Sequence, residues 1–119
     1  AQENIILKSQ GEQFFSYIYV ADAVSALLSI MLSGNCGAAY NIADSQSDIT
    51  LRDLAHLVAN LAGTSIHFEL PDSIEASGFS TATKATQNPF KLHKLGWRPT
   101  YDINTGIEHT LEILKSQNA

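Results

Sequence analysis

The sequence is short of cysteine, of positive charge and of long apolar runs. Its one cysteine, Cys36, excludes an internal disulfide and a cysteine-based zinc site, and no neighbouring base favours a nucleophilic role. No apolar run reaches the ~18 residues of a membrane helix, and Ala1–Asn4 has no basic region typical of a signal peptide. Seven Lys and Arg against twelve Asp and Glu argue against a nucleic-acid-binding face. We therefore expect a cytoplasmic protein without membrane or nucleic-acid partners.

The sequence also lacks the short motifs of several enzyme classes. It contains no Gly-x-Gly-x-x-Gly, no Gly-Lys-Ser or Gly-Lys-Thr, no Gly-x-Ser-x-Gly and no His-Glu-x-x-His. No two of the four histidines are spaced i, i+4, so we assign neither a metal ligand nor a catalytic residue. The composition is nevertheless globular, at 45% hydrophobic and 16% charged residues. We therefore expect a fragment of a longer protein, because the composition is globular, the catalytic motifs are missing and the sequence starts at Ala1 instead of Met.

Apolar side chains recur with helical spacing after Val20. The pattern i, i+3, i+4, i+7, i+8, i+11, i+12 predicts a helix over Val20–Leu32 that stops at Gly34. Asp22 lies in its first turn, where a carboxylate suits the helix dipole. We expect the apolar stripe, Met31 included, to face the core.

Three further helices and four strands follow from capping residues and local patterns. The helices are expected at Thr50–Gly63, opened by a Thr50–Asp53 capping box, at Asn88–Gly96, and from Asp102 to Lys115, with close packing at Gly106. The strands are expected at Glu3–Lys8, Gln13–Val20, Gly37–Ala43 and Ser65–Leu70. Asp72–Gln87 is predicted as a long irregular loop, of the kind that is usually functional or mobile. The expected fold is a small mixed α/β lobe of about four helices and four short strands, in one domain over residues 1–119.

Three segments in order carry a family resemblance. They are Ser16–Ala23 (Ser-Tyr-Ile-Tyr-Val-Ala-Asp-Ala), Ala39–Ala43 (Ala-Tyr-Asn-Ile-Ala) and Lys91–Pro99 (Lys-Leu-His-Lys-Leu-Gly-Trp-Arg-Pro). Together they resemble the carboxy-terminal third of extended short-chain dehydrogenase/reductases, the NAD-dependent nucleotide-sugar epimerases and dehydratases of carbohydrate metabolism. Each motif is weak alone, but their order and spacing make the resemblance specific.

The resemblance implies the C-terminal, substrate-binding portion of a Rossmann-type enzyme, lacking most of the nucleotide-binding sheet. The family's glycine-rich NAD loop and Tyr-x-x-x-Lys catalytic pair do not occur in this chain. NAD is therefore implied for the full-length enzyme, with its missing N-terminal NAD-binding domain, and no cofactor for this chain, which we expect to be inactive alone. Gly37–Ala43 would be an edge strand without its neighbour, so an edge-paired or domain-swapped homodimer is expected.

By resemblance, this lobe grips a nucleotide-sugar diphosphate, a task that suits arginine. The family arginine before the (Ser/Asp)-(Phe/Tyr) motif aligns with Phe15, and a second falls near 84–86, where Lys84 could supply a point charge. Because neither position carries an arginine, this chain is not expected to bind a pyrophosphate in the way usual for the family. Asn41 is the best-supported contact, because its amide can donate to a phosphate or a sugar hydroxyl.

The substrate-binding candidates are Asn41, Gln13, Phe15, Ser16, Ser80 and Lys84. Four of them have a structural alternative: a strand-end cap for Asn41, a core aromatic for Phe15, and a solvated loop for Ser80 and Lys84. Trp97 is expected to pack the last two helices.

Two other interpretations stay open. A freestanding, non-catalytic interaction module derived from the lobe is favoured by the missing arginine at Phe15. An unrelated α/β adaptor would be favoured by a structure without a strand at Ala39–Ala43. The residues that would choose the sugar, the nucleotide or the reaction subtype belong to the absent portion.

Overall fold

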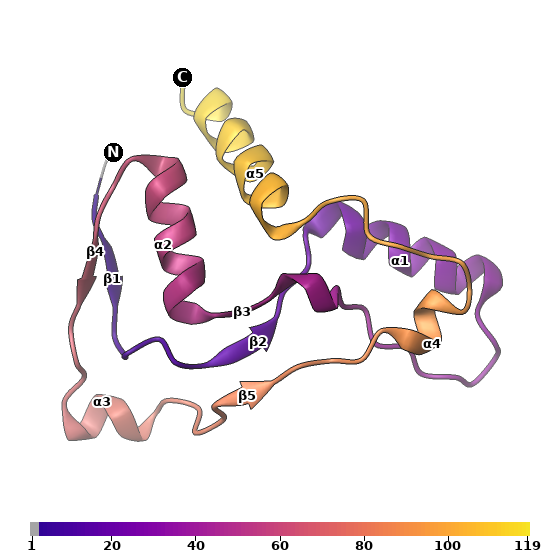
Figure 1. The fold of residues 1–119 in the computed structure, drawn as a ribbon, viewed down its shortest axis with the longest axis horizontal. Helices are drawn as coiled ribbons and strands as arrows, with labels where there is room; N and C mark the ends of the chain where they lie inside the picture. The colour runs from indigo at the N-terminus through magenta and orange to yellow at the C-terminus, as the bar shows by residue number, and fades with distance from the viewer. Residues whose placement is uncertain (1–2) are drawn as a thin grey trace. The chain divides into compact units, whose positions relative to one another are not determined.

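The computed structural model describes residues 3–119, which contain five α-helices and five short strands (Figure 1). The helices are α1 (Val20–Ser33), α2 (Leu51–Ala62), α3 (Ser73–Ser77), α4 (Phe90–His93) and α5 (Ile103–Gln117). The strands are β1 (Ile5–Leu7), β2 (Phe14–Ser16), β3 (Asp48–Thr50), β4 (Ile66–Phe68) and β5 (Lys84–Ala85), and a 3-10 turn covers Ser45–Ser47. The expected mixed α/β class is confirmed.

The chain divides into two compact units, each made of two separate stretches. The first unit comprises the residues up to Phe15 together with Ile49–Ala85, and the second comprises Ser16–Asp48 together with Thr86–Ala119. The boundaries fall inside β2 and β3 and directly after β5, so neither unit is a continuous piece of sequence.

In the first unit, β1 and β4 pair in parallel, with Ile5 opposite Ile66 and Leu7 opposite Phe68. Helix α2 begins where the hydroxyl of Thr50 accepts a hydrogen bond from the Asp53 N–H at 3.1 Å. It ends at Gly63, whose φ of 69° lies in the left-handed region that glycine tolerates. Both boundaries lie where the sequence predicts them, because caps act within one turn. The second bond of the expected capping box, from the Thr50 N–H to the Asp53 side chain, is not recorded among the described residues.

The segment expected to be irregular contains two elements. The Asp72 side chain caps α3 by accepting from the N–H groups of Ile74 and Glu75, and β5 pairs with β2 in parallel. β2 is the central strand of a sheet with the order β3-β2-β5. The sequence prediction was wrong here because β5 exists only through its pairing with a strand far away in sequence.

In the second unit, the core forms where α1 meets the segment around α4. Ala26, Leu92 and Trp97 are buried together. The Trp97 indole N–H donates to the Ser25 hydroxyl at 3.0 Å. Trp97 is therefore structural, as expected, but it packs on α1 as well as beside α4. Partly buried side chains complete this core: Ile18, Ile30, Tyr40, Ile42 and Leu95.

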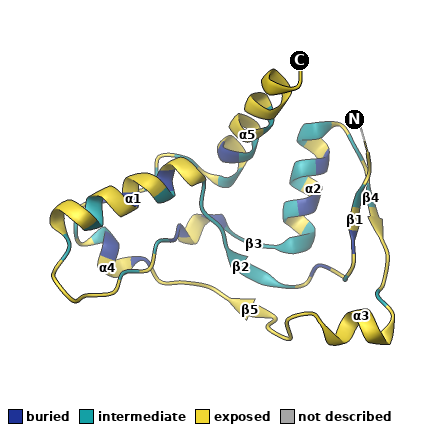
Figure 2. Ribbon diagram, turned by 180° about the vertical axis from the view of Figure 1, so that it is seen from behind, coloured by how far each residue is buried: buried dark blue, intermediate teal, exposed yellow. Residues whose placement is uncertain are grey.

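Helix α1 forms where predicted, but its apolar stripe does not face the core. The buried side chains of α1 are Asp22 and Ala26, whereas Met31 is 75% exposed. Figure 2 shows most of α1 as exposed. The expectation was wrong because the core face uses a small residue that lets Trp97 and Leu92 approach, whereas the large residues of the predicted stripe are each more than half exposed within residues 3–119.

The predicted strand at Gly37–Ala43 is absent. A strand requires a ladder partner, and none pairs with this segment in the described chain. The segment is instead connected to residues 88–91 by side-chain hydrogen bonds. The Lys91 ammonium donates to the Ala39 carbonyl at 3.0 Å, and the Asn41 amide donates to the Asn88 carbonyl at 3.1 Å.

Helix α5 starts with a complete capping box between Asp102 and Thr105. Gly106 is buried against the Tyr19 side chain, which confirms the close packing predicted from this glycine. No helix within residues 3–119 has the length and apolar character needed to cross a bilayer.

Candidate functional site

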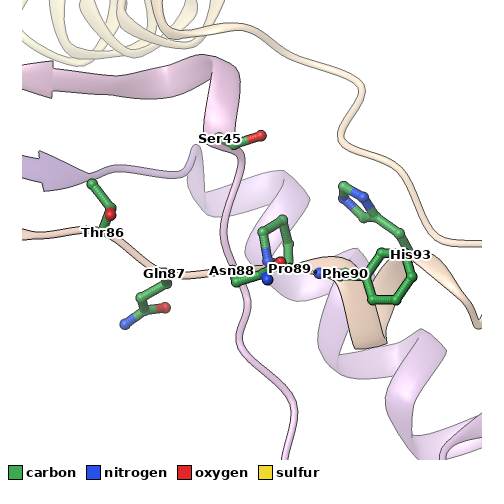
Figure 3. A pocket seen from close by; sticks show the side chains of 7 residues that line it. All are labelled: Ser45, Thr86, Gln87, Asn88, Pro89, Phe90 and His93. Carbon is green, nitrogen blue, oxygen red and sulfur yellow. Dashed lines mark hydrogen bonds between the residues drawn. The ribbon is translucent and has the colours of Figure 1, made fainter.

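An open hollow of about 380 Å³ lies in the second unit, where the chain runs from residue 86 into α4. Figure 3 shows Thr86, Gln87 and Asn88 following one another along this stretch, with Phe90 and His93 on the helix after it. The lining residues are Ser45, Thr86, Gln87, Asn88, Pro89, Phe90 and His93. We call residues 86–88 the site segment.

Two predicted site residues hold the backbone of the site segment. The Ser16 hydroxyl accepts a hydrogen bond from the Gln87 N–H at 2.9 Å. The Asn41 side-chain amide donates to the Asn88 carbonyl at 3.1 Å. Both side chains therefore position the site segment. Asn41 uses one of its two amide hydrogens for this bond, although the amide was expected to donate to a ligand. Its second amide hydrogen and its side-chain carbonyl oxygen can each make a further hydrogen bond.

The hollow offers mainly neutral hydrogen-bonding groups. Ser45 and Thr86 supply hydroxyls and Gln87 supplies a carboxamide. The Asn88 side-chain oxygen is already engaged, since it accepts from the Phe90 N–H at 2.9 Å. The Nε2 atom of His93 is buried and has no hydrogen-bond partner among the described residues.

Positive charge concentrates in and after α4. Lys91, Lys94 and Arg98 are three of the seven basic residues of the chain and fall within eight positions. Their contacts are with carbonyls and aromatic rings: Arg98 donates to the carbonyls of His93 and Trp97, and the Lys94 ammonium lies 4.6 Å from the Phe90 ring centroid. The ion pairs recorded in the described chain involve Lys8 alone. Within residues 3–119 no ion pair is recorded for these three residues, and the Lys94 charge beside Phe90 favours an anion near the hollow.

Other predicted residues lie in the first unit. A smaller hollow of about 140 Å³ there is lined by residues 9–13 and 80–83, which include Gln13 and Ser80. Ser80 accepts a hydrogen bond from the Ala82 N–H at 3.2 Å, a local loop contact. Lys84 is exposed on β5, with its ammonium 5.9 Å from the Phe14 ring centroid, and Phe15 is half-buried on β2.

The six predicted residues are thus divided between the two units. Asn41 and Ser16 converge on the site segment, whereas Gln13 and Ser80 share the smaller hollow. None of the seven residues that line the hollow was among the six predicted, so sequence reasoning missed the lining itself, including Gln87 and His93. The only signal for Gln87 was its place just before the Asn88-Pro89 helix start, and His93 occupies a variable position of the Lys-x-x-x-Leu-Gly-Trp motif.

No protein-family model matches the sequence. Among curated proteins, the dTDP-D-glucose 4,6-dehydratase of Bos taurus is 28% identical over 105 residues, which cover 86% of this chain and 29% of that protein. The Homo sapiens protein of the same name is 26% identical over 89% of this chain and 31% of its own length. The chain therefore spans less than a third of the curated relatives it matches.

Solved structures share the fold. A UDP-glucose 4-epimerase from Thermotoga maritima, solved with UDP-glucose, superposes with a TM-score of 0.83 at 23% identity, covering 99% of this chain and 37% of that one. A dTDP-glucose 4,6-dehydratase from Bacillus anthracis, in complex with NAD, superposes with a TM-score of 0.82 at 18% identity, covering 98% and 36%.

The absent Ala39–Ala43 strand is the feature expected to favour an unrelated adaptor. That inference was wrong, because the fold match holds without the strand. Sequence relatives and structural neighbours agree with the three motifs, so the predicted resemblance is confirmed: the curated relatives are dTDP-D-glucose 4,6-dehydratases, and nucleotide-sugar epimerases and dehydratases share the fold. This chain spans about a third of the length of these proteins.

Proposed function

We propose that this chain is the C-terminal, substrate-binding portion of an NAD-dependent nucleotide-sugar epimerase or dehydratase. The hollow at the site segment carries the proposal. Its lining supplies neutral donors and acceptors, and the Lys94 ammonium lies beside it, 4.6 Å from the ring centroid of the lining residue Phe90. A nucleotide sugar has this mixed chemistry, since its hydroxyls need neutral hydrogen-bond partners and its diphosphate needs positive charge. The relatives support the same assignment by their names.

The residues of this chain do not fit an NAD site. The family's glycine-rich loop and Tyr-x-x-x-Lys pair have no counterpart in the sequence. When bound to the longer protein, NAD would accept a hydride from a sugar carbon and return it. The part of this chain is to bind and orient the nucleotide sugar, so the isolated chain would have no turnover.

Amide-resolved NMR titration of the 119-residue chain with dTDP-glucose and UDP-glucose tests the proposal. We expect saturable shifts at Gln87 and Asn88 and at the His93 ring, and smaller shifts at Ser80. Free glucose is the control for the sugar hydroxyls, and inorganic pyrophosphate for the charge. Shifts confined to the Ser80 region would move the site to the smaller hollow, and no saturable shift would refute the proposal.

One observation favours a second function. Phe15 stands at the position that resembles the family's phosphate-binding arginine, and it is half-buried and uncharged. This supports a non-catalytic interaction module derived from the same lobe. An absence of chemical-shift changes in the titration, together with a native gene product near this length, would favour the non-catalytic interaction module.

A further inference from the structure

The two walls of the smaller hollow in the first unit are held in very different ways. One wall is the loop of residues 9–13, which we call the loop wall, and the other is formed by residues 80–83. Residues 80–82 are the end of a longer exposed segment, residues 72–82, which we call the strap. Both walls belong to the first unit, so the contacts of each one show how firmly it is fixed.

The loop wall is docked on the first turn of α2. The Gly11 carbonyl accepts a hydrogen bond from the Arg52 N–H at 2.9 Å, and the Gln13 carbonyl accepts from the Leu51 N–H at 2.8 Å. The Arg52 Nε–H adds a bond to the Gln10 carbonyl at 2.8 Å. These bonds satisfy amides that the start of a helix leaves without a partner in the helix. Gly11 has a φ of 72°, and a Cβ there would lie 2.8 Å from the Arg52 nitrogen, so loop and helix touch backbone to backbone. This wall is fixed.

The strap is held far less firmly. It runs between β4 and β5 and contains α3, which has no buried residue, and every residue of the strap is exposed (Figure 2). The Ile74 side chain on α3 is 81% exposed. A helix of five residues is marginal in water by itself. Neither apolar burial nor helix length therefore holds the strap in place.

Among residues 3–119, one close polar contact is recorded between the strap and the rest of the chain. The Lys8 ammonium lies 4.0 Å from the Glu75 carboxylate on α3 and 3.2 Å from the Glu69 carboxylate just after β4. The hydrogen bond to Glu69, and then the charge of Glu75, raise the pKa of Lys8 above its ordinary value. All three side chains are about half exposed. Exposed ion pairs are weak and are screened by salt, so Lys8 is a weak restraint on the strap.

We propose that the strap is a movable wall that opens and closes the smaller hollow against the fixed loop wall, and that Lys8, through Glu75, holds it in the observed position. The strap turns about its two ends. Thr83 is fixed to β2, because its carbonyl accepts from the Phe14 N–H at 2.9 Å, and Pro71 is half-buried. Since the restraint is an exposed ion pair, the open population increases with ionic strength. This motion belongs to the first unit and does not depend on nucleotide-sugar binding in the second.

Cleavage of the native 119-residue chain by chymotrypsin after Phe79 reports the open strap, because Phe79 is the only aromatic residue in it. Lys8→Gln should raise the rate of this cleavage about two- to fivefold, as expected for the loss of a weak ion pair. Cleavage after Phe90, which is 60% exposed on α4 of the other unit, is the internal control and should not change. Lys84→Gln, an exposed lysine on β5 with no recorded ion pair, is the control variant and should behave as the wild type. Lys8→Arg should keep the wild-type rate.

Salt and chemical shifts complete the test. Adding about 0.5 M NaCl should raise the ratio of Phe79 to Phe90 cleavage in the wild type and leave the ratio of Lys8→Gln unchanged. The amide shift of Thr81 should change in Lys8→Gln, whereas that of Gly11 in the loop wall should not. A Phe79 to Phe90 ratio that neither Lys8→Gln nor salt raises would overturn the proposal. Shift changes at Gly11 as large as those at Thr81 would also overturn it, because both walls would then move.

Discussion

The buried carboxylate of Asp22 accepts a hydrogen bond from the backbone N–H of Thr100 at 2.9 Å. Its second oxygen accepts from the next amide, that of Tyr101, at the same distance. A side chain in the first turn of α1 thereby holds the link between Trp97 and α5, 78 positions away in the sequence. This contact joins the first and last helices of the second unit.

Replacing Asp22 by Ala should destabilise the chain by about 2–4 kcal/mol, because two amides lose a charged acceptor inside the structure. Asp22→Asn should lose less, since its single carbonyl oxygen can still accept one bond. Urea unfolding followed by Trp97 fluorescence measures both. Glu112→Ala, an exposed change on α5, is the control, and a loss for Asp22→Ala no larger than the control's would contradict the role.

Gly106→Ala should destabilise the chain although alanine is the better helix former by ~1 kcal/mol. A Cβ at Gly106 would lie 3.1 Å from atoms of the Tyr19 side chain, whose ring is tilted against Tyr101 and whose hydroxyl is hydrogen-bonded to His109 at 2.7 Å. The Tyr19 side chain must therefore shift by a few tenths of an ångström, which strains its contacts with Tyr101 and His109. Thermal unfolding checks the sign, and Asn104→Ala on the same helix should raise the melting temperature. An increase for Gly106→Ala would show that the ring yields freely.

Asn41→Ala should loosen the site segment by removing the bond to the Asn88 carbonyl. We expect faster amide exchange at 86–90 and nucleotide-sugar affinity lowered by about fivefold, in keeping with a lost neutral hydrogen bond of ~1 kcal/mol. Asn118→Ala, which removes a similar bond within α5, is the matched control. Unchanged exchange at Asn88 would show that Ser16 alone suffices to hold the segment.

The contribution of the Asp102 cap to the stability of α5 should depend on pH. Hydrogen bonds from the Thr105 backbone and then its side chain lower the pKa of Asp102 from its ordinary value. A lowered pKa in the folded state means that ionised Asp102 stabilises the fold above the unfolded-state pKa, and that this contribution disappears as pH falls through the folded-state pKa.

Asp102→Asn keeps a capping oxygen but cannot titrate. The stability difference between the wild type and the Asp102→Asn variant should therefore be largest at neutral pH and should shrink as the solution is acidified below the ordinary aspartate range. Denaturant unfolding at successive pH values measures it. A difference that stays constant with pH would show that the cap acts only as a hydrogen-bond acceptor.

Local features of this protein were predictable from its sequence because they act within a few residues. Thr50 and Asp102 start helices by bonding to amides three positions on, and Gly63 ends one through its left-handed backbone. The helical period of α1 and the order of the three motifs are properties of the chain itself. The mixed α/β class and the relationship to nucleotide-sugar enzymes followed from them.

The packing partners were decided only by the tertiary structure, because sequence periodicity shows that an element has an apolar face but not which residues pack against it. Periodicity showed that α1 has an apolar face, but only packing showed that Ala26 and Asp22 face the core while Met31 faces outward. Gly37–Ala43 has the composition of a strand but no ladder. Asn41 and Ser16 bind the site segment because folding brings together residues 47 and 71 positions apart, a proximity that no local pattern encodes.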